Sequence, residues 1–214
     1  MDSLLFPREA SELKAVDPDL KKILASSNQE IRERSEKLKK TINDLPSYLS
    51  FVDDVLADYK KNGAVALKVG IAYSRTLWFD DPDWEEVAGI FAEGLASKLD
   101  SWEKYKKVQD FVARHIFLKA GELGLPVHFH TGFGADAGLK NLDSNPLNLE
   151  SIFSDVRFKN TQFLMLHAGY PFWDKLKPLL EKRNVFVEFS AANWMVFEEE
   201  LTNSHLVRQN AGPL

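Results

Sequence analysis

Three histidines stand at positions where short apolar runs end. His128 and His130 lie one residue apart in "LPVHFHTG" (125–132), and His167 follows "FLML" in "TQFLMLHAG" (161–169). If these runs are strands, His128 and His130 point to the same face, because side chains alternate along a strand. Neutral imidazole is the usual nitrogen ligand of zinc, and a catalytic zinc site uses about three protein ligands. The spacing therefore predicts a metal site or a metal-free acid–base site, with hydrogen-bonded core histidines as the alternative interpretation.

Lys68 stands in the middle of another apolar run, "AVALKVGIAY" (64–73). A lysine there extends towards a strand end or faces a polar interior. Two functional roles are predicted as alternatives: Lys68 would bind a substrate carboxylate, or it would become carboxylated and bridge metals. The structural alternative is an ion pair with a carboxylate on a neighbouring strand, such as Glu188. Tyr73 and Arg75 follow the run, and the Arg75 guanidinium is predicted to bind an anion. The predicted substrate-binding side chains are therefore His128, Lys68, Tyr73 and Arg75.

Hydrophobic periodicity predicts the elements that position these side chains. Four short apolar runs predict strands, at residues 64–73, 125–132, 161–169 and 184–192. Amphipathic stretches between them predict helices, at residues 80–99, 101–124, 145–156 and 170–183. Alternating strands and helices with short connections are typical of parallel β/α units, whose strands all end at one rim. We therefore predict that His130 and His167 lie at that rim, where β/α barrels build their active sites.

The order of the elements predicts one domain over residues 1–214, because no low-complexity segment or long linker interrupts it. Amphipathic patterns predict that residues 1–62 form a helical N-terminal segment. Parallel β/α units are expected over residues 63–196, and residues 197–214 are expected to form a tail.

Composition limits the classes of function. The chain has 214 residues, 44% of them hydrophobic, a net charge of −5 and no cysteine. Basic residues are scattered among acidic ones, which argues against nucleic-acid binding. No apolar run approaches the roughly 18 residues needed to cross a bilayer, and no signal peptide is recognisable, so we expect a cytoplasmic protein without a membrane partner. Without cysteine, any metal must be held by His, Asp, Glu or Lys.

Five segments together resemble the amidohydrolase superfamily, in the amidohydrolase-2 branch that includes the nodulin/FluG-like metal-dependent hydrolases. They are "ALKVGIAYSR", "LPVHFHTGFG", "NPLNLESIF", "LMLHAGYPFWDKL" and "NVFVEFSAANW", and they span roughly residues 62–196 in the expected order. The resemblance implies an α/β fold of the TIM-barrel (β/α)8 type with one or two divalent metals at the C-terminal rim. It also implies hydrolysis of an amide or ester, or related C–C or C–N chemistry.

The resemblance also implies roles for individual residues. His130 matches the fifth-strand histidine that ligates metal, and His167 matches the sixth-strand histidine, a ligand or catalytic group. Lys68 falls on the fourth strand, where some branches carry a metal-bridging lysine. Zinc is the expected metal, with manganese or iron as alternatives; it would lower the pKa of its bound water and produce a hydroxide that attacks a carbonyl carbon. His167 would help to stabilise the oxyanion that forms. The basic side chains suggest a small, anionic substrate.

Two signatures of the superfamily are missing from this sequence. No histidine precedes residue 60, so the first-strand H-x-H pair is absent, and no G-[ST]-D motif follows "VEFSAANW" to supply the eighth-strand aspartate. The visible strands match the fourth to seventh strands, which predicts a partial barrel. Such a barrel exposes two sheet edges, so we expect a homo-oligomer or a complementing segment. The alternative function is a catalytically inactive truncated barrel that acts as a binding or assembly module.

Overall fold

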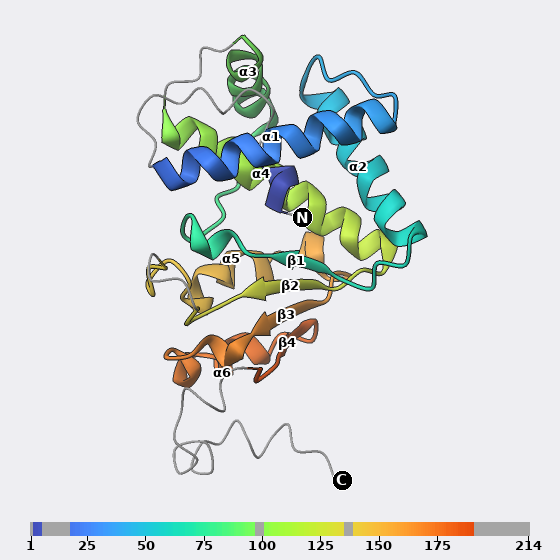
Figure 1. Cartoon of the computed structure of the whole chain (residues 1–214). Helices are drawn as coiled ribbons and strands as arrows, with labels where there is room; N and C mark the ends of the chain where they lie inside the picture. The colour runs from blue at the N-terminus through green and yellow to red at the C-terminus, as the bar shows by residue number, and fades with distance from the viewer. Residues whose placement is uncertain (1, 6–17, 97–100, 135–138, 191–214) are drawn as a thin grey trace.

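The structure, a computed structural model, describes residues 2–5, 18–96, 101–134 and 139–190. The longer helices are α1 (Pro18–Lys37), α2 (Leu45–Lys61), α3 (Trp84–Leu95) and α4 (Trp102–Leu123). The shorter ones are α5 (Glu150–Phe153) and α6 (Lys177–Leu180). The strands are β1 (Leu67–Val69), β2 (Val127–His130), β3 (Phe163–Leu166) and β4 (Val185–Val187). In Figure 1 the longer helices lie together beyond β1, and α6 lies beside β4 at the other end of the sheet.

The four strands form one parallel sheet in the order β1-β2-β3-β4. This confirms the predicted α/β fold with parallel β/α units. Each strand is only three or four residues long, shorter than the apolar run that predicted it. After β1, for example, the chain turns into a 3-10 helix at Ile71–Tyr73, and the carboxylate of Asp2 accepts the Gly70 backbone N–H at 2.8 Å. Further 3-10 turns occupy Asp2–Leu5, Pro146–Leu149, Val156–Phe158, His167–Gly169 and Trp173–Lys175.

Local signals in the sequence set the ends of the helices. Ser101 is the N-cap of α4, and its hydroxyl accepts the Lys104 backbone N–H, while Gly124 ends the helix with a left-handed φ of 61°. The helix predicted at 170–183 is much shorter, because Pro178 has no backbone N–H and fits only the first turn of α6. No helix among the described residues is long and apolar enough to cross a membrane.

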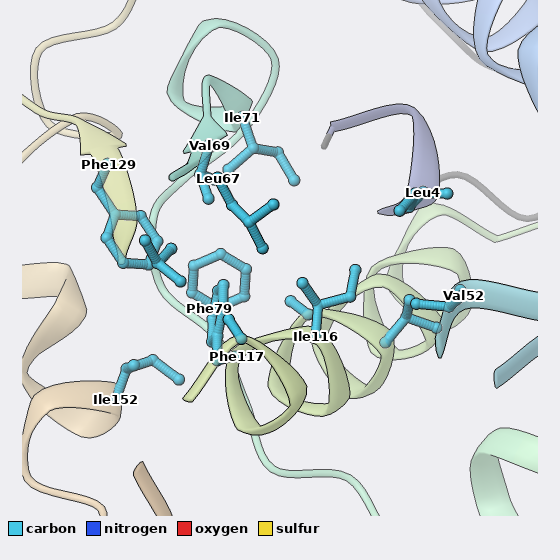
Figure 2. Packing of buried hydrophobic residues seen from close by; sticks show 14 of the residues in the cluster. Leu4, Val52, Leu67, Val69, Ile71, Phe79, Ile116, Phe117, Phe129 and Ile152 are labelled. Atoms are coloured by element: carbon cyan, nitrogen blue, oxygen red, sulfur yellow. The ribbon is translucent and has the colours of Figure 1, made fainter. Parts of the chain in front are cut away.

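The hydrophobic core fills the space between one face of the sheet and the longer helices. Phe129 of β2 packs edge-on against Phe117 of α4, with ring centroids 5.4 Å apart, and Phe79 contacts both rings (Figure 2). These rings are fully buried. The three rings come from three segments, so this cluster joins the sheet to the layer formed by the longer helices, called the helical layer below.

The opposite face of the sheet is open. Lys68 on β1 and Phe186 on β4 are exposed, the latter by 46%, and His128 between them is half-buried. These side chains share one face, because register pairs Lys68 with His128, His128 with Leu164, and Leu164 with Phe186. In a closed barrel this face would line the interior.

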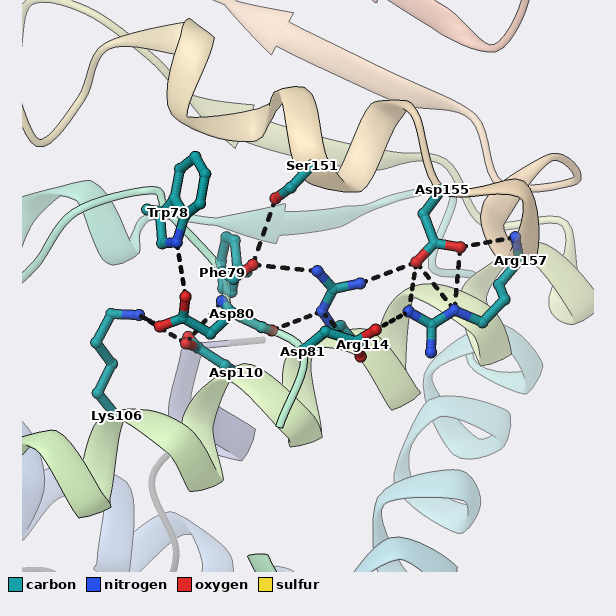
Figure 3. Close-up of polar contacts among 10 residues, drawn as sticks. All are labelled: Trp78, Phe79, Asp80, Asp81, Lys106, Asp110, Arg114, Ser151, Asp155 and Arg157. Atoms are coloured by element: carbon teal, nitrogen blue, oxygen red, sulfur yellow. Dashed lines mark hydrogen bonds and ion pairs between the residues drawn. The ribbon is translucent and has the colours of Figure 1, made fainter. Parts of the chain in front are cut away.

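A polar network fastens the segment before α3 to α4 and to the turn at Val156–Phe158 (Figure 3). The Arg114 guanidinium donates to the carbonyls of Phe79 and Asp80 and pairs with Asp155 at 2.9 Å. Asp155 also accepts from Arg157. The network therefore holds the loop that follows β1 against the helical layer.

The single-domain prediction stays a prediction. Within the predicted N-terminal helical segment the structure describes α1, α2 and the turn at Asp2–Leu5. The predicted tail at 197–214 lies outside the described residues.

Candidate active site

His130 is the last residue of β2 and is almost completely buried, with 4% of its surface exposed. Next to it, the Thr131 hydroxyl donates to the Leu166 carbonyl at 2.6 Å and ties the ends of β2 and β3 together. Burial, the charge of Lys68 and the neighbouring His167 together lower the pKa of His130 to about 4. The ring is therefore neutral at physiological pH, and its buried Nε2 has no hydrogen-bond partner. A neutral imidazole with a free nitrogen is the form that binds a metal.

His167 directly follows β3, and its ring faces His130 at a centroid distance of 4.9 Å and an interplanar angle of 63°. Its Nδ1 lies 2.9 Å from the Ser190 carbonyl oxygen. A carbonyl oxygen only accepts, so Nδ1 carries the proton in this hydrogen bond, and in the neutral ring the lone pair is on Nε2. This arrangement, with Nδ1–H bonded to a carbonyl, is the usual support of a metal-binding histidine. The structure thus brings together the two predicted metal ligands.

The turn that carries His167 has an unusual backbone. His167 and Ala168 have φ values of 66° and 51°, in the left-handed region that non-glycine residues rarely adopt. Each such residue costs about 1–2 kcal/mol relative to a right-handed conformation. Two in succession indicate that surrounding contacts enforce the shape of this turn.

Three predicted substrate-binding residues lie on the same face as the histidines. The Tyr73 hydroxyl is 3.5 Å from His130 Nδ1, and the two ring centroids are 4.4 Å apart. Lys68 and His128 are register partners on β1 and β2. Partial burial lowers the pKa of His128, and the charge of Lys68 adds to that effect. The open face therefore offers a phenol, an ammonium and a neutral imidazole beside the His130–His167 pair, while their binding of substrate stays a prediction.

The structure does not bring Arg75 to this group. Its side chain is buried, 2.7 Å from the Asp110 carboxylate of α4, and its guanidinium lies over the Phe79 ring. Asp110 lies on α4 and Phe79 lies in the loop that packs against α4, on the other side of the sheet from the histidines. The predicted anion clamp has no support in this geometry, because burial and pairing with Asp110 already engage the Arg75 charge.

From the sequence, Glu188 is the alternative ion-pair partner of Lys68, and Ser190 has no predicted role. Glu188 follows β4, and its carboxylate accepts the His167 backbone N–H at 2.8 Å and the Ser190 N–H at 2.6 Å. The alternative interpretation paired Glu188 with Lys68, but its hydrogen bonds go to the His167 turn. Strand parity is the signal that could have found both residues, because Glu188 and Ser190 are two apart, like His128 and His130.

A glycine-dependent turn closes the rim beside His130. Gly132 has a φ of 69°, and a Cβ atom there would lie 2.1 Å from the Tyr170 carbonyl oxygen. The next residue, Phe133, donates its backbone N–H to the same oxygen at 2.6 Å. The turn after β2 therefore packs directly on the turn after β3, and only glycine fits at this contact.

The two imidazoles fit a divalent metal in part. Their Nε2 atoms supply nitrogen donors of the type that zinc prefers. Among the described residues, however, no group of three or more His, Asp or Glu side chains could hold a metal ion. The described part of the chain thus brings together two predicted ligands, fewer than the three or four that a zinc site uses.

Comparison with known families identifies the chain. The amidohydrolase-2 family model, described as amidohydrolase, matches residues 50–210. The chain belongs to the amidohydrolase family. This matched segment contains all four strands and both histidines of the pair. The amidohydrolase therefore has a fold of the TIM-barrel type, and its described residues form part of the barrel.

A solved structure agrees with this fold. A "putative metal-dependent hydrolase" from Lactobacillus casei ATCC 334 superimposes on the amidohydrolase chain with a TM-score of 0.57 and 20% sequence identity. The match covers 69% of this chain and 39% of that chain, so this chain spans less than half of that protein's length. At this identity the likeness shows the fold alone. No protein with a curated description matches the chain.

Proposed function

We propose that this amidohydrolase chain takes part in the metal-dependent hydrolysis of an amide or ester bond, or a related C–C or C–N bond, in a small anionic substrate. The observation that carries the proposal is the pair of imidazoles at the ends of β2 and β3, in which His130 is neutral with an unpartnered Nε2 and His167 binds the Ser190 carbonyl through Nδ1. Family membership and the solved metal-dependent relative support it. A cytoplasmic location is proposed from the sequence alone.

His130 and His167 would hold the metal, with zinc favoured by the nitrogen donors and manganese or iron as alternatives. A divalent metal supplies a hydroxide at neutral pH by lowering the pKa of bound water. Lys68 and His128 would attract and orient the substrate on the open face. The Tyr73 hydroxyl, 3.5 Å from His130 Nδ1, would orient that ring or donate to a substrate oxygen.

One observation favours a second function. Because the described residues contain no group of three metal-binding side chains, the chain alone would bind a metal weakly and would then act as a binding or assembly module.

Zinc titration of metal-free protein, followed by calorimetry or a competing chelator, separates the two functions. We expect one zinc per chain, bound at least about tenfold more weakly by His130→Ala, because a lost ligand costs more than a lost supporting contact. His115→Ala is the matched control, since His115 lies on α4 and pairs with Asp53 at 2.8 Å. Unchanged affinity in His130→Ala, or no zinc binding by the unaltered protein, would leave the module as the function.

A further inference from the structure

We propose that Glu188 is a positioning residue, whose carboxylate fixes both the backbone turn and the ring tautomer of His167. The role as a metal-site support rests on the proposed function, but the control of ring geometry does not. Glu188 lies just beyond β4 and is 21 residues from His167 in the sequence. Its side chain is 29% exposed, so substitutions there open no cavity in the core.

The backbone of Glu188 continues the pairing between β3 and β4 past the ends of both strands. Its N–H donates to the Met165 carbonyl at 3.0 Å, and its carbonyl accepts the Ala168 N–H at 2.8 Å. Between these two backbone contacts, the Glu188 carboxylate accepts a hydrogen bond from the His167 N–H at 2.8 Å. Glu188 thus binds both residues that have left-handed φ values, His167 and Ala168. Since such a conformation persists only where its surroundings enforce it, these hydrogen bonds explain how the turn is kept.

The same carboxylate places the group that binds the His167 ring. It accepts the Ser190 backbone N–H and the Ser190 hydroxyl, both at 2.6 Å. This fixes the Ser190 carbonyl oxygen 2.9 Å from His167 Nδ1, with the Ser190 hydroxyl oxygen 3.1 Å from the same nitrogen. The carbonyl requires a proton on Nδ1, so in the neutral ring Nε2 has the lone pair, and this ring packs against that of His130. Through Ser190, Glu188 therefore selects the tautomer of His167 that can ligate a metal.

The Glu188 carboxylate does not select the His167 tautomer through direct contact with the ring. Glu188 Oε1 lies 3.9 Å from His167 Nδ1, beyond hydrogen-bond distance. The carboxylate acts on the backbone of His167 and on Ser190, and the ring follows from those two constraints. Control of the His167 ring therefore requires the position of the Glu188 carboxylate as well as its negative charge.

The test uses Glu188→Gln and Glu188→Asp in the full chain. The glutamine keeps an acceptor for His167 N–H but presents an N–H₂ group to the Ser190 N–H. The aspartate keeps the charge on a side chain one methylene shorter. Imidazole ¹⁵N NMR on histidine-labelled, metal-free protein reports the tautomer of His167, and zinc titration reports the affinity. Glu181→Gln, at an exposed position after α6, is the matched control.

We expect the His167 signal of the unaltered protein and of Glu181→Gln to show the Nδ1–H tautomer. Both Glu188 variants should show a mixture of tautomers and bind zinc about 10- to 100-fold more weakly, the usual cost of losing a supporting contact. Adding Ala168→Gly to Glu188→Gln should recover part of the zinc affinity, because glycine adopts the left-handed conformation without strain.

Two results would overturn the inference. One is an unchanged His167 tautomer in both Glu188 variants, and the other is a zinc affinity in both that equals that of the Glu181→Gln control. The NMR measurement needs no metal. A changed tautomer in a protein that binds no zinc at all would therefore refute the proposed function while the control of the His167 ring by Glu188 stands.

Discussion

Residues of the same type take different roles here because their surroundings differ. His130 is buried, has a free Nε2 and faces His167, whereas His128, two positions earlier on the same face, is half-buried and paired in register with Lys68. His115 on α4 is bound to Asp53. His130 combines burial, neutrality and an unused nitrogen, and among the described histidines His167 is the one whose ring contacts it, which is why the proposed metal chemistry is assigned to this pair.

Asp155 provides a test of the polar network at the scale of one residue. Its carboxylate is largely buried and paired with Arg114 and Arg157. We expect Asp155→Asn to lower the free energy of unfolding at pH 7 by about 2 kcal/mol, because two guanidinium groups lose one of their charged partners. Chemical denaturation of Asp155→Asn and of Asp174→Asn checks this; Asp174 is exposed and pairs with the neighbouring Lys175.

The stability lost in Asp155→Asn should depend on pH. Hydrogen bonding from Arg157 lowers the pKa of Asp155 below that of an unfolded aspartate. The stability from this carboxylate is therefore complete above the unfolded value, about 3.9, and is lost as the pH falls through the lower folded value. The difference in unfolding free energy between the unaltered protein and Asp155→Asn should shrink between pH 5 and strongly acidic pH, by the ~2 kcal/mol given above. A difference that grows on acidification would contradict this assignment.

At the scale of elements, the site depends on the turns after the strands more than on the strands. β2 and β3 each contribute one histidine, but the contact between the turns that follow them fixes the distance between the rings. Gly132 makes that contact possible, since it has a φ of 69° and lies against the Tyr170 carbonyl. The Glu188 carboxylate holds the second turn from β4.

Replacing Gly132 tests the importance of this turn. We expect Gly132→Ala to destabilise the protein by about 3 kcal/mol, from the left-handed φ and from overlap with the Tyr170 backbone, and to weaken zinc binding. Gly89→Ala is the control, because Gly89 is an exposed residue of α3 with open space around its Cβ position. It should stabilise the protein by about 0.5–1 kcal/mol. Thermal unfolding of both variants measures the two changes, and equal effects would refute the steric argument.

At the scale of the whole molecule, the open sheet is the dominant feature. Within the described residues β1 and β4 each have one strand neighbour, so both leave an unpaired edge. The Gly70 N–H points away from β2, because alternate residues of a parallel strand bond to opposite sides and Leu67 N–H donates to Pro126. Asp2 accepts this N–H. The remaining edge and the face with Phe186 stay exposed.

We propose that a second copy or a complementing segment covers this open face. Light scattering after gel filtration should show self-association that Phe186→Lys weakens by about tenfold or more, because buried aromatic anchors carry much of an interface's affinity. Val156→Lys is the control, since Val156 is 75% exposed in a turn whose neighbouring Asp155 is bound to Arg114 of α4. A stable monomer at all concentrations would contradict self-association and leave the complementing segment.

The amino-acid sequence by itself determined the parallel β/α organisation and the meeting of His130 and His167 at one rim. Hydrophobic periodicity and side-chain alternation are local properties, so they can be recognised without coordinates. Helix ends marked by Ser101 and Gly124 were predictable for the same reason. The family resemblance, now confirmed, added the interpretation of the histidine pair.

Only the tertiary structure decided how the remaining polar residues are used. Arg75 pairs with Asp110, and Glu188 holds the turn at His167, although neither partner is close in the sequence. Such contacts depend on the packing of a helix on a sheet or on pairing beyond strand ends, which no local pattern encodes. The left-handed turn at His167 follows from the same constraint, because contacts from another strand impose a conformation that its own residues disfavour.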